Sequence, residues 1–268
     1  MNTPSQGSPV HVLTRDAARA IDRACVEEFA LPTIVLMENA ALHAAGVAAS
    51  MLDPPSEAAR VLIVAGPGAN GGDGLAIARH LHNQGVRVAI LLAADPASLK
   101  GDADVQLGVV QKMALPLTVW NADDPVASID RAIEPIGSDV DLVIDALFGS
   151  GLRRDVVGPH ATLIHALNTR IADGADALAV DVPSGLDIDT GEPRGVAIRA
   201  DVTVTFAAAK VGFAAIAAQP FVGEVVVADI GAPRALVERF GQPAPEPLTP
   251  ADALEVAPAS APPPTPGR

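Results

Sequence analysis

Short apolar runs recur along the chain from residue 60 onward. Most are apolar at successive positions and not at every second one, which is typical of strands buried on both faces of a sheet. They are also rich in β-branched residues, so each is predicted to be a strand. The predicted strands are residues 60–65, 86–92, 116–120, 141–147, 177–182, 201–206 and 224–230.

Helical patterns separate several of these strands, and this alternation predicts a mostly parallel sheet with helices on both faces. Two more helices are predicted before the first strand, with Thr14 as the N-terminal cap, a break at 31–33 and an end at 53–56, the "DPPS" segment. The later helices are expected at residues 73–84, about 98–113, 125–136 and 159–172, with Gly85 as the C-terminal cap of the first.

The regular pattern ends near residue 242. The remaining sequence is rich in Pro and Ala and holds almost no large apolar residue, which is typical of a linker or an extended tail. We therefore expect one α/β domain over residues 1–242, followed by a Pro/Ala-rich linker or disordered tail over residues 243–268.

Composition and charge narrow the range of partners. Hydrophobic residues make up 49 % of the 268 positions, enough for a large core. The net charge of −14 disfavours nucleic acid and anionic membranes as partners. The apolar stretch 33–52 carries Glu38, Asn39 and His43, which makes it a poor membrane span. No secretory signal is visible in the first ten residues, so we expect a cytoplasmic protein.

Ligands of an open parallel sheet bind beyond the carboxyl ends of the strands, where the connecting loops gather. The notable polar residues fall in four such loops, which are expected to line one cleft. No histidine lies in any of them, so a Ser-His-Asp triad is poorly supported. The loops are residues 66–74, 145–155, 181–191 and 207–213.

The first loop, "GPGANGGDG" at residues 66–74, holds five glycines. We expect these glycines to permit positive φ angles and a close approach of the ligand to the backbone. Asp73 is expected to cap a helix that begins near Leu75, whose free N–H groups would suit an anion. Taken as G-x-G-x-x-G, the loop also fits an NAD-dependent dehydrogenase, for which Asp95 would be the acidic residue after the second strand.

Two aspartates follow buried strands. Asp145 lies within an apolar run, where a carboxylate is costly unless it is paired, so a cation ligand or a catalytic group is favoured over a capping role. Asp181 repeats this arrangement and is followed by Ser184. Oxygen atoms from Asn70, Asp145 and Ser184 would suit a hard cation, such as an alkali metal ion, better than zinc.

Three cationic residues leave alternatives open. Arg153 and Arg154 either are solvated or contact a phosphate of the ligand. Lys210 lies among apolar residues and glycine, so it either extends to solvent or faces the cleft with a lowered pKa.

Four segments in sequence order resemble the NAD(P)H-hydrate epimerases, the YjeF N-terminal domain family. They are "GPGANGGDGLAIARHL", "VIDALFGSGL", "AVDVPSGLD…TG" and "ADVTVTFAAAKVGF", and "LMENAA" at 36–41 matches as well. The resemblance covers about residues 14–240 and implies a Rossmann-like fold that is often dimeric. The expected fold is therefore an α/β, three-layer α/β/α sandwich with a mostly parallel sheet and two N-terminal helices.

The resemblance also implies an activity, the interconversion of the S and R forms of hydrated NADH (NADHX) and NADPH (NADPHX) at C6 of the nicotinamide ring. It implies a potassium ion (K+) held by Asn70, Asp145 and Ser184. We choose Asp181 as the acid/base, with Lys210 as its partner or as a stabiliser of charge. The implied substrate contacts are Ala69, Asn70, Gly71, Gly72, Asp73, Gly149, Ser150, Gly151, Leu152, Arg153, Arg154, Asp155 and Asp181.

One position departs from the family pattern. The glycine pair usually follows two asparagines, and the first of these is Ala69 here, which removes a side-chain hydrogen bond and leaves the backbone contact possible. In many bacterial members an ADP- or ATP-dependent dehydratase domain follows the epimerase domain. The ending "PPPTPGR" looks like the run-up to such a domain, so a bifunctional enzyme and a separate epimerase both stay open.

A homodimer is expected from the resemblance, and two other functions stay open. An NAD-dependent dehydrogenase would need a substrate domain with a proton donor, which the pattern after residue 242 does not predict. A non-catalytic nucleotide- or protein-binding module of the same fold would be favoured by loss of Asp181 or Asn70, and both residues are present.

Overall fold

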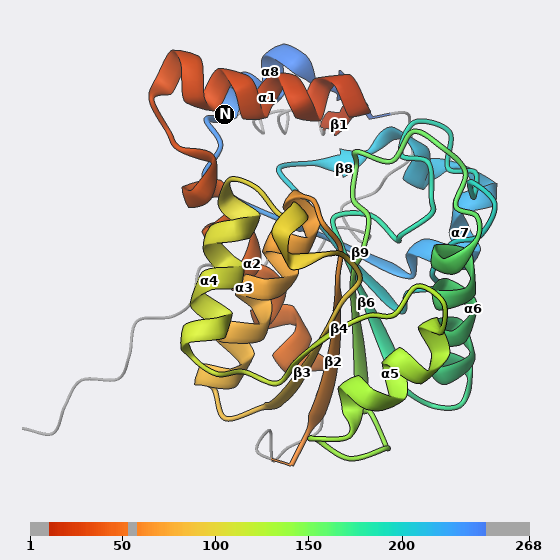
Figure 1. The fold of residues 1–268 in the computed structure, drawn as a ribbon. Helices are drawn as coiled ribbons and strands as arrows, with labels where there is room; N and C mark the ends of the chain where they lie inside the picture. The colour runs from red at the N-terminus through yellow and green to blue at the C-terminus, as the bar shows by residue number, and fades with distance from the viewer. Residues whose placement is uncertain (1–10, 53–57, 245–268) are drawn as a thin grey trace, which may run out of the picture.

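A seven-stranded parallel sheet lies between two layers of helices in the computed structural model, which describes residues 11–52 and 58–244 (Figure 1). Each neighbouring pair of strands is parallel. In spatial order the strands are β4 (Leu117–Val119), β3 (Arg87–Leu92), β2 (Arg60–Ala65), β5 (Leu142–Ala146), β6 (Asp176–Val180), β7 (Val202–Phe206) and β9 (Glu224–Ala228). The chain order reverses between β2 and β5, which is the topological switch point at which such folds bind ligands.

Helices cover both faces of this sheet, because successive strand residues point to opposite sides. In β2, Val61 and Ile63 pack toward one layer, whereas Leu62 and Val64 pack toward the other. This explains why the strands are apolar at successive positions. The first layer is α2 (Thr33–Met51), α3 (Ala69–Asn83) and α4 (Asp102–Lys112), and the second is α5 (Pro125–Ile133) and α6 (Pro159–Ala172).

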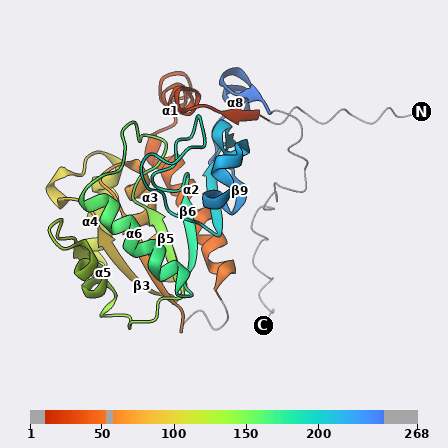
Figure 2. The same ribbon diagram turned by 90° about the vertical axis from the view of Figure 1, so that its right-hand side faces the viewer.

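A smaller group of elements, the cap, lies across one end of the sheet (Figure 1 and Figure 2). Its helices lie side by side and are α1 (Arg15–Phe29) and α8 (Arg234–Phe240). Its strands are β1 (His11–Leu13), β8 (Ala209–Lys210) and β10 (Gln242–Pro243), with β1 in the middle. The cap has its own apolar cluster, which includes Ile21, Cys25 and Leu236.

The predicted strands are confirmed to within two residues at each end. Thr14 caps α1 as predicted, because its Oγ1 accepts a hydrogen bond from the Ala17 N–H at 3.2 Å. Gly85 follows α3 with φ 89°, the left-handed conformation that a glycine after a helix provides. The segment 98–113 contains the end of a short 3₁₀ helix, η1 (Pro96–Ser98), and then α4, and α5 ends at Ile133.

The sequence analysis missed the short elements. These include α8 and the strands of the cap, which are two or three residues long. The pairing of β10 extends to Pro243, inside the segment assigned to the tail. The rest of that tail and the "DPPS" segment lie outside the described residues. The other missed elements are η2 (Val211–Ala214), η3 (Ile216–Ala218) and α7 (Gln219–Val222).

The prediction for the glycine-rich segment was wrong in two respects. Helix α3 begins at Ala69, so Asp73 lies inside the helix and does not cap it. None of the five glycines has a positive φ. Four of them are required for close packing instead, and Gly68 is not: a Cβ at Gly66 would lie 1.9 Å from the Leu147 carbonyl oxygen, and one at Gly71 would lie 1.9 Å from that of Gly66.

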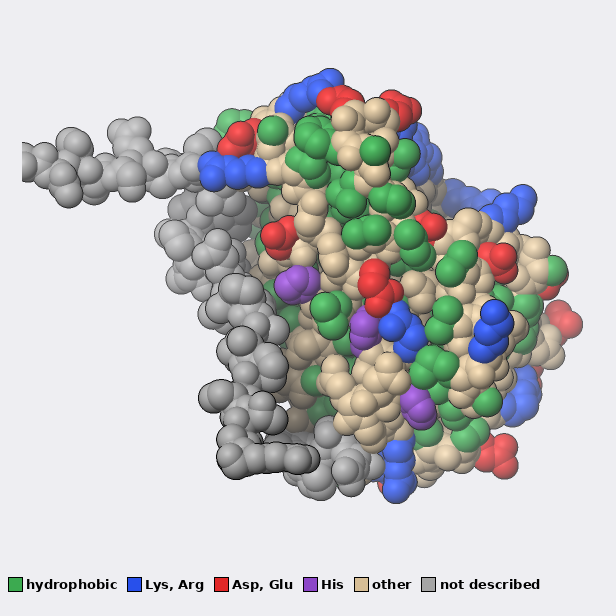
Figure 3. All heavy atoms as spheres, turned by 90° about the vertical axis from the view of Figure 1, so that its left-hand side faces the viewer, with side chains coloured by type: hydrophobic (Ala, Val, Ile, Leu, Met, Phe, Trp, Pro, Cys, Tyr) green, Lys and Arg blue, Asp and Glu red, His purple; other side chains and the backbone are tan. Residues whose placement is uncertain are grey.

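Within the described residues, α2 is long and apolar enough to cross a membrane by length and composition alone. Its alanines Ala44 and Ala48 are fully buried against the sheet. Figure 3 shows hydrophobic side chains gathered on the outer side of this region, where α1 ends and α2 begins. The exposed large hydrophobic residues of α1 and α2 are Val26, Phe29, Val35 and Leu42, and we call them the apolar face.

Candidate active site

A cleft of about 940 Å³ opens at the switch point, between the sheet and the cap. Residues from all four predicted loops line it, as the sequence analysis expected. Helix α1 supplies a further wall through Arg19 and Asp22, and the start of α2 supplies Thr33. The parallel topology therefore brings segments that are far apart in the sequence to one site.

An ion pair between Lys210 and Asp181 lies in the cleft. The Lys210 Nζ is 2.9 Å from Asp181 Oδ1, and it also donates to the carbonyl oxygens of Phe206 at 3.1 Å and Ala208 at 3.3 Å. These contacts engage all three N–H donors of the ammonium group, so Lys210 is held in one orientation. The Lys210 side chain is 2 % exposed, which rules out the alternative that it extends to solvent.

Asp181 has an unusual backbone conformation. Its φ is 64°, in the left-handed region that residues other than glycine rarely adopt. The Asp181 N–H donates to the Val204 carbonyl at 2.7 Å, and Asp181 Oδ2 accepts from the Ser150 N–H at 3.4 Å. Strained residues of this kind cluster at functional sites, because the surrounding structure must hold them in place.

Four more carboxyl groups, those of Asp22, Asp73, Asp102 and Asp155, line the cleft. Asp73 is buried, and its carboxyl accepts no hydrogen bond from the described part of the chain. Burial raises the pKa of Asp73 well above its usual value, and the charges of Asp181, Asp22 and Asp102 raise it further. Such a concentration of negative charge favours a cation in the cleft.

Asp22 has a raised pKa although its side chain is open to the cleft. Desolvation by the surrounding protein raises this pKa most, and the Asp181 charge adds to the effect. Lys210 and Arg23 act in the opposite direction. The charges of Asp22, on α1, and of Asp181 therefore act on one another across the cleft.

Asp145 and Ser184 lie beneath the floor of the cleft, 1 % and 0 % exposed. Asp145 Oδ2 accepts from the Ser184 N–H at 2.7 Å, and Asp145 Oδ1 accepts from the Ser184 hydroxyl at 2.6 Å. Burial raises the pKa of Asp145 to about 6, although hydrogen bonds from Ser184 and Leu147 oppose the rise. The Ser184 Oγ also lies 3.1 Å from the Phe148 carbonyl oxygen. The predicted proximity of Asp145 and Ser184 is therefore present.

Asn70 is buried at the start of α3, and neither its Oδ1 nor its Nδ2 has a hydrogen-bond partner among the described residues. A Cβ at Gly149 would lie 3.0 Å from Asn70 Cγ, so the Asn70 amide packs beside the residue that follows Phe148. A buried amide without a partner is costly unless another group satisfies it. A hard cation prefers oxygen ligands, and oxygen atoms are supplied here by Asn70, Asp145, Ser184 and Phe148. These residues therefore fit the expected K+.

The loop 149–155 forms one side of the cleft along its whole length. Arg153 and Arg154 are exposed there, and Arg153 lies 3.6 Å from Asp16 in a solvated ion pair. The His160 ring also lines the cleft, with its centroid 4.6 Å from that of Trp120 and 5.2 Å from that of Phe148. Burial lowers the pKa of His160, and Arg154 lowers it further. Guanidinium groups beside apolar rings suit the phosphates and bases of a nucleotide.

Most of the predicted substrate contacts line the cleft. They are Ala69, Asn70, Asp73, residues 149–155 and Asp181. Gly71 and Gly72 do not line it, because they pack inside the first turns of α3 against Gly66 and Met37.

Asp95, which the dehydrogenase alternative requires, is exposed outside the cleft lining. Its side chain accepts from the Ala97 N–H at 2.9 Å and so caps η1. Asp22 and Asp102 could not be found from the sequence as site residues, because acidic residues on helix surfaces and at helix starts carry no local sign of a site. Asp22 had one available signal, its charge on the apolar side of a helix that faces the ends of the strands.

Comparison with known proteins identifies the family of this chain. The family described as "YjeF-related protein N-terminus" matches residues 33–212, a range that contains Asn70, Asp145, Asp181 and Lys210. The chain belongs to this family. The resemblance inferred from the four sequence segments is thereby confirmed.

Two relatives show how much of the chain is shared. An NAD(P)H-hydrate epimerase of Limosilactobacillus fermentum is 40 % identical over 217 residues, covering 81 % of this chain and 95 % of the relative. A bifunctional NAD(P)H-hydrate repair enzyme Nnr of Moorella thermoacetica is 37 % identical over 228 residues, covering 85 % of this chain. The chain spans 42 % of the length of that bifunctional relative.

A solved structure supports the fold. The crystal structure of yeast ynu0, YNL200c, superposes with a TM-score of 0.70 at 20 % identity, and the match covers 91 % of this chain and 98 % of that one. The three-layer architecture expected from the sequence is therefore confirmed.

Proposed function

We propose that this protein interconverts the S and R epimers of hydrated NADH and NADPH at C6 of the nicotinamide ring. The observation that carries the proposal is Asp181, held at φ 64° and paired with Lys210 in a cleft of about 940 Å³. This volume lies in the range of pockets that enclose a small molecule of this kind. A relative named as an NAD(P)H-hydrate epimerase is 40 % identical over 217 residues, which supports the same activity here.

The reaction needs one proton carrier and no redox step. In the substrate, the C6 hydroxyl and the ring nitrogen form a hemiaminal. Asp181 in its acid form gives a proton to the hydroxyl oxygen, the C–O bond breaks, and water leaves while the nitrogen lone pair forms an iminium. Water then adds to either face of C6, and the Asp181 carboxylate takes the proton back.

The charges of the cleft support this assignment. The iminium is a cation, and Asp22, Asp73 and Asp181 face the cleft in which it would form. Lys210 cannot easily rotate toward the substrate, because it is bound to two carbonyl oxygens as well as to Asp181. Its role in the proposal is to hold the Asp181 carboxylate in place.

We also propose that K+ binds Asn70, Asp145 and Ser184. The unpartnered Asn70 amide and the buried oxygens beside it support this proposal. When bound, the ion supplies positive charge beneath the cleft floor. Asp145 and Ser184 are bound to each other, and the Phe148 carbonyl oxygen lies 3.1 Å from the Ser184 Oγ, so the chain itself holds these oxygens together beside Asn70.

The test follows resolved S- and R-NADHX by chromatography in potassium buffer, with spontaneous epimerisation as the control. The protein is expected to accelerate the approach to the epimer equilibrium, and Asp181→Asn is expected to remove at least about 100-fold of that rate. An active Asp181→Asn variant would refute the role of Asp181. A wild-type rate equal to the control, with the protein folded by circular dichroism, would refute the function.

Partners follow from the same proposal. We propose a homodimer, which the exposed residues of the apolar face support (Figure 3). Sedimentation equilibrium of the wild type and of Phe29→Asp tests it, because a charge on this face is expected to shift a dimer to the monomer. We also propose that the protein acts with a dehydratase, fused or separate, since relatives named as bifunctional repair enzymes contain this region.

A further inference from the structure

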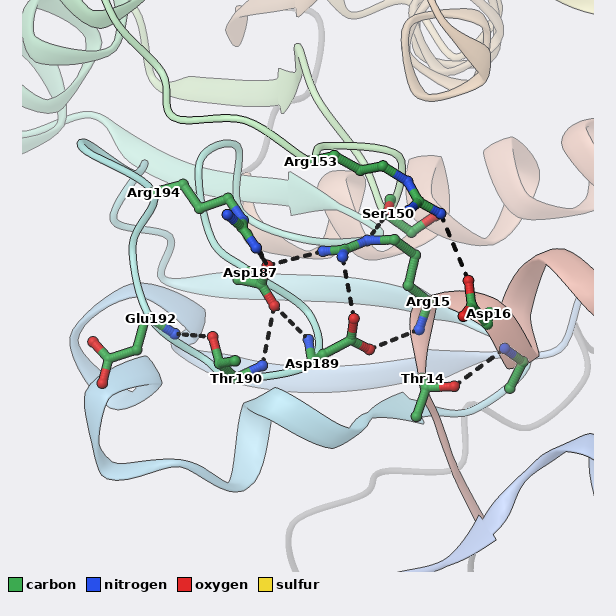
Figure 4. Close-up of polar contacts among 11 residues, drawn as sticks. Thr14, Arg15, Asp16, Ser150, Arg153, Asp187, Asp189, Thr190, Glu192 and Arg194 are labelled. Carbon is green, nitrogen blue, oxygen red and sulfur yellow. Dashed lines mark hydrogen bonds and ion pairs between the residues drawn. The ribbon is translucent and has the colours of Figure 1, made fainter.

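Arg15 joins three segments that lie far apart in the sequence (Figure 4). It is the first residue of α1 and is 8 % exposed. Its Nε donates to the Ser150 carbonyl at 2.9 Å, and its Nη2 donates to Asp187 Oδ2 at 3.0 Å. Its Nη1 lies 3.1 Å from Asp189 Oδ2. One guanidinium therefore connects the cap, the loop 149–155 and the loop after β6.

The carboxylates around Arg15 are themselves fixed. Asp187 Oδ1 accepts from the backbone N–H groups of Asp189 at 2.9 Å and Thr190 at 3.1 Å, and Asp187 Oδ2 also accepts from Arg194 Nε at 2.6 Å. Asp189 Oδ1 accepts from the Arg15 N–H at 2.8 Å and so binds the start of α1. Both the backbone and the side chain of Arg15 are thus held in place by contacts other than the one with Ser150.

Ser150 needs an external anchor. It lies between Gly149 and Gly151, which leave the backbone free to rotate and supply no side chain to pack. Its carbonyl accepts from Arg15, and its N–H donates to Asp181 Oδ2 at 3.4 Å. The conformation of this single residue therefore couples Arg15 to the proposed acid/base.

We propose that Arg15 is a positioning residue of the cleft, which holds the Ser150 carbonyl and thereby aims the Ser150 N–H at Asp181. The proposal rests on the proposed epimerase function for its kinetic consequence, but not for its structural one. Arg15 touches neither the Asp181 carboxylate nor Lys210. It acts through the backbone of Ser150 and fixes the loop 149–155 against α1.

Arg194 provides a matched control. Both guanidinium groups pair with the Asp187 carboxylate, and Arg15 is the one of the two that binds the Ser150 carbonyl. Replacing either by Met removes one ion pair from Asp187 and leaves the other. Arg15→Lys is the conservative variant: it keeps the positive charge near Asp187 and Asp189 but lacks the planar fork that reaches three partners at once.

The first experiment measures kcat, KM and the thermal midpoint of the wild type, Arg15→Met, Arg15→Lys and Arg194→Met. We expect kcat to fall about tenfold in both Arg15 variants, because the loop and Asp181 are no longer aligned. In Arg194→Met, which leaves the Arg15 contacts with Ser150 and Asp189 in place, we expect kcat within about twofold of wild type. Equal kcat losses in Arg15→Met and Arg194→Met would overturn the proposal.

The second experiment does not depend on activity. Amide hydrogen exchange of a peptide spanning residues 147–155 is expected to be about tenfold faster in Arg15→Lys than in the wild type, and unchanged in Arg194→Met. Unchanged exchange in Arg15→Lys would overturn the proposal even if kcat had fallen. If the wild type shows no epimerase activity, the proposed function fails and the exchange data still decide the role of Arg15. If Arg15→Met does not fold, Arg15→Lys carries both measurements.

Discussion

Two buried aspartates, Asp187 and Asp73, meet opposite surroundings in this protein. Asp187 is 2 % exposed and receives two arginines and two backbone N–H groups. Asp73 is 8 % exposed and faces other carboxylates. Burial alone would raise both pKa values, but the donors around Asp187 overcome this and hold its pKa below the usual value, whereas the pKa of Asp73 is raised.

This difference distinguishes a residue that holds the structural framework together, Asp187, from a residue of a binding site, Asp73. A buried charge whose partners all come from the protein fixes the positions of the segments that supply them, as Asp187 does for α1 and the loop after β6. A buried carboxyl without such partners is retained at a cost to stability. A strongly perturbed group of this kind in a cleft is the usual sign of a functional residue.

Of the two aspartates compared, Asp73 is expected to give the larger effect on activity: Asp73→Asn should lower kcat about 100-fold, since it removes a titratable carboxyl group with a perturbed pKa from the cleft. The same change should raise thermal stability at alkaline pH. Because the pKa of Asp73 is raised in the folded state, the wild type loses stability as the pH rises through that pKa. Asparagine does not ionise, so the variant does not lose this stability. The gain should therefore shrink toward pH 4.

Steady-state kinetics and thermal unfolding between pH 4 and pH 9 measure both effects. Asp95→Asn serves as the control, because Asp95 is exposed outside the cleft. If Asp73→Asn is fully active and less stable than the wild type at every pH, Asp73 belongs with Asp187 as a framework residue.

Asp187→Asn should give the opposite result. It should destabilise the fold by about 3 kcal/mol at pH 7, because Arg15 and Arg194 lose a buried partner. A depressed folded pKa contributes stability above the unfolded pKa, and this contribution is lost as the pH falls. The difference from wild type should therefore decrease below about pH 4.

Urea unfolding followed by circular dichroism gives these free energies. Asp139→Asn is the matched control, because the Asp139 side chain is 84 % exposed and its ion pair with Arg60 lies in solvent, so the free energy of unfolding should hardly change. A constant difference between Asp187→Asn and wild type from pH 3 to pH 8 would show that the effect is not one of charge.

A smaller effect is expected from potassium, which would supply the partner that Asn70 lacks in the described part of the chain. Replacing Na+ with K+ at equal ionic strength should stabilise the protein by about 1 kcal/mol at neutral pH. Asn70→Ala should abolish this response, and Asp187→Asn should retain it. Thermal scans in the two salts make the measurement, and equal midpoints in K+ and Na+ for the wild type would remove the potassium proposal.

The smallest effect is expected from Arg153→Ala. Its pair with Asp16 joins side chains that are 62 % and 91 % exposed, so unfolding should change by less than about 0.5 kcal/mol. A substrate phosphate in reach of this guanidinium would show as a KM raised about threefold with kcat unchanged. An unchanged KM assigns Arg153 to the solvated surface.

The sequence predicted the sheet and the meeting of the four loops well, because buried strands leave a continuous apolar pattern and parallel topology determines where their ends lie. It failed at the start of α3. Glycine is a poor helix former, so "GANGGDG" suggested a loop, but Gly71 and Gly74 permit contacts with the backbone of Gly66 and the Cβ of Ala146 that no other residue allows.

The Arg15 network could not be predicted for a different reason. Its hydrogen bonds join residues 135 to 174 positions apart, and nothing in the local pattern of α1 distinguishes Arg15 from the other arginines of that helix. The strands of the cap could not be predicted either, because two or three residues are too few to show the alternating pattern of a strand.

The central position of β1 in the cap also determines when the site can form during synthesis. β1 pairs with β8 and β10, so a strand made near the beginning of translation finds its partners when residues 209–243 have left the ribosome. Until then Ile21 and Cys25 of α1 lack Leu236, which completes their cluster. The nascent chain can fold much of its sheet while its cap waits, so the proposed enzyme should become active in a late, slow step that depends on contacts between the two ends of the domain.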